Sequence, residues 1–110
     1  MLLFNSLTGL KTLKLSFNRL ARLDSGVFSR ITAIDTIDLS NNLLTTLETR
    51  TFDGLLYLRV IDLRNNQISQ VEAGLMYNLP NLQSVYMSGN PCYTIYGVHT
   101  LQNLICGPQN

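Results

Sequence analysis

Apolar residues occupy the second and fourth positions of four short segments of the chain, at residues 12–16, 36–40, 60–64 and 84–88. An alternation with a period of two predicts a short β-strand that buries one face and exposes the other. The four segments lie 24 residues apart, so each buried position has an equivalent in the next segment. The first such row, which we expect to be buried throughout, is Leu13, Ile37, Ile61 and Val85.

Other apolar positions keep the same 24-residue step between the predicted strands. Their spacing within one repeat is too irregular for a long helix, so it indicates a curved return path of turns and short helical pieces. Repeats of this kind bury their apolar rows only against neighbouring repeats. The positions are Leu20, Leu44, Ile68 and Cys92, then Phe28, Phe52 and Met76, then Ile31, Leu55 and Leu79.

An asparagine recurs where the chain leaves each predicted strand, at Asn18, Asn42, Asn66 and Asn90. A side-chain amide carries both a donor and an acceptor, so it can bond backbone groups of its own turn and of the adjacent coil. Buried backbone groups that no sheet reaches need such partners. We therefore expect these four residues to form a structural ladder along the molecule.

The composition narrows the class of protein. The chain has 110 residues, 45% hydrophobic and 14% charged, which is too apolar for a disordered protein. Its net charge of +1 provides no positive field for nucleic acid, and no apolar stretch is long enough to insert into a membrane. Leucine occurs 21 times and asparagine 11 times, as expected of a repeated unit with fixed positions for both.

The segment from Leu10 to Ile31, LKTLKLSFNRLARLDSGVFSRI, resembles a leucine-rich repeat of the 24-residue typical subtype. The resemblance implies an α/β solenoid, a right-handed superhelix with a short parallel sheet on its concave face and mostly irregular or 3-10 turns on its convex face. We expect one domain over residues 1–110, with full repeats at 10–33, 34–57 and 58–81. In the family, this subtype belongs mostly to secreted and cell-surface recognition proteins.

Both ends depart from the repeat. Residues 1–9 have the pattern of the tail of a preceding repeat, so we expect a fragment whose uncapped N-terminal edge favours self-association. Residues 82–110 contain the last strand and a degenerate C-terminal cap. Because relatives often close this end with cysteines, the resemblance implies a Cys92–Cys106 disulfide. The residues alone leave open the alternative that Cys92 replaces a core leucine and both thiols are free.

The residues give little support for catalysis. His99 is the only histidine, and no acid or amide near it in the sequence orients it toward Cys92 or Cys106. Metal sites need more His, Cys or clustered carboxylates than the chain supplies. The glycines occupy turn positions of the repeat, so they do not form a glycine-rich phosphate-binding loop. We therefore expect no enzymatic activity, no cofactor and no metal.

The outward positions of the predicted strands form lateral rows on the concave sheet. One row is Lys14, Asp38, Asp62 and Tyr86, in which Asp38 and Asp62 face each other as like charges. Lys14, Arg59 or Arg64 would relieve this repulsion internally; alternatively, a basic group of a partner would do so. We expect a protein ligand to bind here, through Lys14, Asp38, Asp62, Tyr86, Arg64, Phe17 and Arg59.

Two functions from different classes fit these features. The first is a recognition module of an extracellular protein, such as a secreted or cell-surface receptor or adhesion protein. The second is a non-catalytic structural or assembly subunit of a secreted complex, such as the leucine-rich subunit of a luciferase. The second would use the convex or terminal surfaces rather than the concave sheet.

Overall fold

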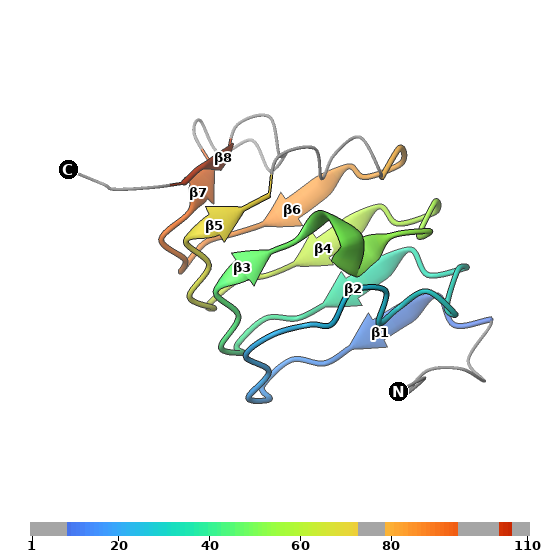
Figure 1. The fold of residues 1–110 in the computed structure, drawn as a ribbon, viewed down its shortest axis with the longest axis horizontal. Coiled ribbons are helices and arrows are strands. Elements are labelled where there is room, and N and C mark those ends of the chain that lie inside the picture. The colour runs from blue at the N-terminus through green and yellow to red at the C-terminus, as the bar shows by residue number, and fades with distance from the viewer. Residues whose placement is uncertain (1–8, 73–78, 95–103, 107–110) are drawn as a thin grey trace.

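The computed structural model describes residues 9–72, 79–94 and 104–106, which form a stack of coils (Figure 1). Each coil contributes one short strand to a four-stranded parallel sheet of order β1-β2-β4-β6. Because the chain completes one full coil between one strand and the next, neighbouring strands in the sheet run in the same direction. The strands are β1 (Thr12–Lys14), β2 (Thr36–Asp38), β4 (Val60–Asp62) and β6 (Ser84–Tyr86).

The sheet register follows the 24-residue step of the sequence. Leu13 pairs with Ile37, Ile37 with Ile61, and Ile61 with Val85, and all four side chains are buried. The strands end at residue 14 and its equivalents rather than at 16. Backbone hydrogen bonding nevertheless continues, because the N–H groups of Leu15 and Phe17 donate to the next coil. The predicted buried row is therefore confirmed, with strands two residues shorter than expected.

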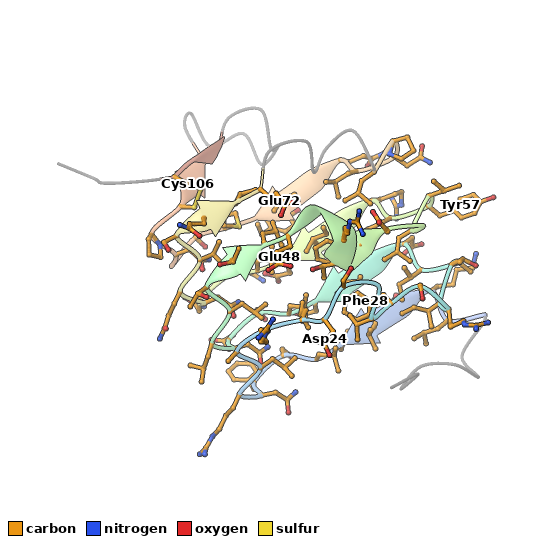
Figure 2. All side chains as sticks on the ribbon, in the orientation of Figure 1. Asp24, Phe28, Glu48, Tyr57, Glu72 and Cys106 are labelled. Carbon is orange, nitrogen blue, oxygen red and sulfur yellow. A yellow bond between two sulfur atoms is a disulfide. The ribbon has the colours of Figure 1, made fainter. Side chains whose placement is uncertain are left out.

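The core lies inside the coils, between the sheet and the return path (Figure 2). Phe28 and Phe52 are fully buried, with ring centroids 5.9 Å apart and planes inclined by 20°. Such stacking continues the core from one coil to the next, as the repeat pattern predicts. Some positions of the first coil, among them Leu15 and Leu20, are only partly buried, whereas Phe28 and Ile31 of the same coil are fully buried. Met76 lies outside the residues described.

The return path contains a second pair of strands that the sequence did not predict. Strand β3 (Thr46–Leu47) pairs in parallel with β5 (Gln70–Val71), and the 3-10 helix η1 (Thr49–Phe52) follows β3. Two residues are too few to show an alternation, so these strands leave no periodic signal. The short 3-10 helix and irregular turns agree with the convex face that the resemblance implies.

Three of the four ladder asparagines bond to the preceding coil, whereas among the described residues Asn18 bonds only to Leu15 and Ser16 of its own turn. Asn42 Nδ2 donates to the carbonyl oxygens of Leu39 in its own coil and Leu15 in the preceding one, both at 3.0 Å. Its Oδ1 accepts a bond from the N–H of Leu20. Asn66 and Asn90 make the equivalent bonds one and two coils later. Each of these three side chains therefore ties two successive coils together.

The residue before each ladder asparagine has a left-handed backbone, with φ of 58° at Phe17, 57° at Asn41, 61° at Asn65 and 81° at Gly89. Asparagine and glycine tolerate this conformation better than other residues, whereas a phenylalanine there is unusual. Gly89 is also required by space, because a Cβ would lie 3.1 Å from the backbone nitrogen of Asn65 and overlap its Oδ1. The row lets the chain turn sharply away from the sheet.

At the C-terminal end, β7 (Tyr93–Thr94) pairs antiparallel with β8 (Leu104–Ile105). A disulfide joins Cys92 and Cys106, so the alternative of two free thiols is wrong. His99 and residues 1–8, with the expected tail of a preceding repeat, lie beyond the part of the chain that is described. Among the described residues, no helix has the length and apolar character to cross a membrane.

Candidate functional site

The row predicted on the concave sheet is present, because the sheet register places its members side by side. Lys14 pairs with Asp38, Asp38 with Asp62, and Asp62 with Tyr86. Neighbouring strands lie about 4.8 Å apart, so the side chains form one continuous strip. Each flanks a buried residue and therefore points to the outer face of the sheet. We refer to these four residues as the concave row.

Arg64 neutralises Asp62 within the site. Its Nε donates to Oδ1 at 2.9 Å and its Nη2 donates to Oδ2 at 2.7 Å, while its backbone N–H also donates to Oδ1. Burial alone would raise the pKa of Asp62, but the hydrogen bonds and charge of Arg64 outweigh it and hold the pKa below that of an ordinary aspartate. Of the internal cations considered, Arg64 is thus the one that pairs with this carboxylate.

Asp38 is held by uncharged groups instead. Its Oδ1 accepts bonds from the Ser40 hydroxyl at 2.7 Å and from the Ser40 backbone N–H at 3.0 Å. The ion pairs found in the described residues are Arg64–Asp62 and Arg59–Asp35, and neither includes Asp38. The concave row therefore presents a carboxylate that is oriented by Ser40 and lacks a direct ion pair, with the charge of Arg64 acting on it from a longer distance.

Tyr86 and Arg64 form the other end of the site. The guanidinium carbon of Arg64 lies 5.8 Å from the centroid of the Tyr86 ring, within the range of a cation–π contact. Arg64 therefore links Asp62 to Tyr86 across two strands. Because the Arg64 guanidinium contacts both Asp62 and the Tyr86 ring, the aromatic ring and the charged groups are ordered together. This order lowers the entropic cost of using them in binding.

Two further predicted binding residues lie beyond opposite ends of the strands. Arg59 precedes β4 and forms a long ion pair of 4.0 Å with Asp35. Phe17 follows β1 and is 79% exposed, more than any other large hydrophobic residue described. The structure thus brings Lys14, Asp38, Asp62, Tyr86 and Arg64 together and leaves Arg59 and Phe17 at the margins.

Sequence reasoning missed two features of this surface. Ser40 holds Asp38, and the signal was the Asp-x-Ser spacing that places both residues on one face of a strand. Tyr57, in the turn before β4, exposes 65% of its surface (Figure 2). Its signal was a break in the repeat, since the equivalent positions hold Gly9, Ala33 and Asn81.

Metal-ligating side chains are not clustered in the part of the chain described, where no group of three His, Cys, Asp or Glu residues is arranged to hold an ion. The carboxylates of the concave row instead bond to a serine and an arginine. The arrangement is suited to hydrogen bonding, ion pairing and aromatic contact with another molecule.

Comparison with known proteins identifies the repeat. A family model described as leucine rich repeat matches residues 2–44 and 32–91. No curated protein matches the chain significantly. Among solved structures, the chain is similar to one in the Drosophila Toll–Spatzle complex, described as a molecular hub in development and innate immunity, with a TM-score of 0.76 and 25% identity.

Two further structures extend the comparison. Human 5T4, also named Wnt-activated inhibitory factor 1 or trophoblast glycoprotein, matches with a TM-score of 0.68 and 30% identity over 82% of this chain. A chain of the Drosophila melanogaster SNF/U2A' complex matches with a TM-score of 0.64 and 32% identity over 72%. The Toll–Spatzle match covers 80% of this chain. This chain spans only 12% of the matched chain in the Toll–Spatzle complex, 32% of 5T4 and 44% of the matched chain in the SNF/U2A' complex.

Proposed function

Because the chain belongs to the leucine-rich repeat family, we propose that it is a recognition module that binds a protein partner through the concave row and Arg64. The family consists mainly of non-catalytic interaction modules. Two of the similar structures are described as complexes, one with Spatzle and one of SNF with U2A'. This likeness supports a binding role, while the proposed contact surface comes from the chain's own residues.

The observation that carries this proposal is the state of the two neighbouring carboxylates. Asp62 forms a salt bridge with Arg64, whereas Asp38 is fixed by Ser40 and forms no salt bridge within the described part of the chain, so Arg64 acts on it only through its charge at longer range. A basic group of a partner would complete the row at Asp38. Tyr86 adds an aromatic contact of the type enriched at binding hot spots.

We further propose an extracellular or cell-surface location. A disulfide between Cys92 and Cys106 is favoured in oxidising compartments and is rare in the reducing cytosol. The fold likeness to Toll and 5T4 is consistent with this location. Tethering by a longer parent protein or secretion in free form would both satisfy the proposal.

The matched substitutions Asp38→Asn and Asp53→Asn test the charged part of the site against a protein that co-purifies with the chain. Both remove one exposed or half-exposed carboxylate, but Asp53 lies just after η1 on the convex side. We expect Asp38→Asn to slow association and to weaken its salt dependence, because charged groups steer encounter. Asp53→Asn should leave both unchanged, and an equal effect of the two variants would contradict the proposal.

The assembly-subunit alternative makes the opposite prediction. If the chain joins a complex through its convex or terminal surfaces, binding losses should concentrate at exposed convex residues such as Ser29 and Arg30, or in residues 93–110. An alanine scan across both faces against the same partner distinguishes these functions.

A further inference from the structure

A notch opens at the edge of the sheet where the strands begin. It has a volume of about 250 Å³ and is lined by Lys11, Ala33, Asp35, Tyr57 and Arg59. Its shape follows from the residues at one repeat position, which are Gly9 and Ala33 in the first two coils and Tyr57 in the third. Two small residues beside a large one leave a hollow, and the tyrosine forms one wall.

The wall of the notch is exposed rather than packed. Tyr57 exposes 65% of its surface; Leu56, which precedes it and does not line the notch, exposes 54%. The equivalent positions of the preceding coil are Ala33 and Thr32. Asn81 Nδ2 donates to the carbonyl oxygen of Leu56 and so ties this turn to the next coil. The core does not explain two adjacent exposed hydrophobic residues, but a partner that covers them would.

The charges around the notch favour an anion. Lys11 and Arg59 contribute two positive charges and Asp35 one negative charge. Asp35 Oδ1 already accepts a bond from the Thr36 hydroxyl at 2.8 Å, and its ion pair with Arg59 is long, at 4.0 Å. Arg59 is half-exposed, and Lys11 makes no ion pair with a described residue. Both cations can therefore turn toward an incoming negative group.

We propose that this notch is a second docking site, which receives an acidic side chain flanked by apolar residues from a protein partner. The carboxylate would lie between Lys11 and Arg59, and the apolar neighbour would cover Tyr57. A volume of about 250 Å³ is smaller than a typical small-molecule pocket of roughly 300–1,000 Å³, so it suits a side chain. The site does not depend on the concave row being a contact surface.

Direct titration of the isotopically labelled 110-residue chain tests this site by NMR without the natural partner. The probe is acetyl-Leu-Glu-Leu-amide at low ionic strength, and its neutral match is acetyl-Leu-Gln-Leu-amide. We expect saturable shifts at the amides of residues 11, 33, 35, 57 and 59, with a dissociation constant on the order of millimolar because the probe is small. The glutamine peptide should bind several-fold more weakly.

Variants then assign the contacts. Lys11→Gln and Arg59→Gln should each weaken the glutamate peptide by about two- to fivefold, the usual size of an exposed ion pair. Arg50→Gln, which removes an exposed charge on the convex side, should have no effect. Tyr57→Ser should weaken both peptides, whereas Leu43→Ser, which removes an exposed apolar side chain away from the notch, should weaken neither. Arg59→Lys should retain most of the binding and shows that the site survives substitution.

Three results would overturn the proposal. The first is the absence of saturable shifts at the notch. The second is equal binding of the two peptides, or an equal loss in Arg50→Gln, because either would remove the specific role of Lys11 and Arg59. The third is that inorganic phosphate alone reproduces every shift, because the apolar wall would then contribute nothing. None of these results bears on the concave row, so the two proposals fail independently.

Discussion

Arg64 holds Asp62 through two parallel contacts, with Nε at 2.9 Å from Oδ1 and Nη2 at 2.7 Å from Oδ2. The pair lies on the open face of the sheet, yet the Asp62 side chain is only 13% exposed. Two-point pairing of this kind fixes orientation as well as charge. It also allows two aspartates to occupy adjacent strands without leaving both carboxylates unpaired.

This pair predicts how stability depends on pH. Since the pKa of Asp62 is lower in the folded chain than in the unfolded chain, the interaction stabilises the fold at and above the ordinary aspartate pKa. The stabilisation is lost as the pH falls through the lowered value. We expect Arg64→Gln to raise the pKa of Asp62, measured by NMR, and to lower the melting temperature most near neutral pH. Arg50→Gln is the control, and a loss in Arg64→Gln that stays constant down to strongly acidic pH would contradict this origin.

The asparagine ladder predicts unequal costs for the same substitution. Asn42→Ala removes bonds to two coils and leaves buried backbone groups unpaired, each worth about 1–3 kcal/mol. Asn18→Ala removes only local bonds to Leu15 and Ser16, and Asn18 is exposed. Urea unfolding should therefore show a larger loss of unfolding free energy for Asn42→Ala. Equal losses would show that ties between coils are not what the ladder provides.

The left-handed row determines which control is valid for that experiment. Asn41→Ala resembles a surface control, but Asn41 has φ of 57°, where alanine itself is strained. Asn41→Gly avoids this strain, and we expect it to change the free energy of unfolding by only a few tenths of a kcal/mol. A loss as large as that of Asn42→Ala would mean that the Asn41 side chain has a structural role of its own.

Replacing Phe17 should stabilise the fold and weaken partner binding in the same variant. A phenylalanine with φ of 58° costs roughly 1 kcal/mol relative to a residue that tolerates this region, so Phe17→Asn should raise the melting temperature. Because Phe17 is 79% exposed, little packing is lost. If Phe17 belongs to the binding surface, the same variant should weaken the partner. A variant with lower stability would show that the aromatic ring packs usefully in the free chain.

The close approach of Gly89 to Asn65 offers a double-mutant test. Gly89→Ala should destabilise the fold because of its φ of 81° and because its Cβ meets Asn65. Asn65→Gly removes the overlapping Oδ1, so the double variant should recover part of the loss. Additive losses, measured by thermal unfolding, would show that the overlap with the Asn65 side chain contributes nothing and that the backbone carries the cost, through the φ of Gly89 and the close approach to the Asn65 backbone.

The disulfide closes the C-terminal coil and should contribute about 3 kcal/mol, the entropic value for a loop of roughly 15 residues. Cys106→Ala is the better variant because Cys106 is exposed, whereas Cys92 is fully buried. Unfolded, unreduced wild-type protein should show no reactive thiol, and Cys106→Ala should show one. Two reactive thiols in the wild type would exclude the bridge.

Periodicity was sufficient to predict the sheet register and the ladder bonds of Asn42, Asn66 and Asn90, because both depend on every repeat carrying the same type of residue at the same position. Leu13, Ile37, Ile61 and Val85 are buried as expected, and Asn42 makes the bonds its phase predicts. Features made by departures from the repeat were harder to see. Phe17 has the left-handed backbone at a position where the later coils carry Asn or Gly. Tyr57 forms the notch only because the equivalent residues Gly9 and Ala33 are small.

Charge partners also depended on geometry beyond the pattern. The sequence placed Asp38 beside Asp62 but left three cations as candidates for neutralising them. The structure selects Arg64 for Asp62, since both residues lie on one face two positions apart. It assigns Ser40 to Asp38, a polar partner that charge counting does not reveal.

Binding through the concave row is tested most directly by one comparison of dissociation rates. Tyr86→Ala removes the aromatic group at the end of that row, and Ser29→Ala alters an exposed convex position. With the co-purifying partner protein, we predict that Tyr86→Ala dissociates at least about tenfold faster, as expected of a hot-spot aromatic. Ser29→Ala should dissociate at the wild-type rate. An unchanged rate for Tyr86→Ala, with faster dissociation for Ser29→Ala, would contradict recognition through the concave sheet.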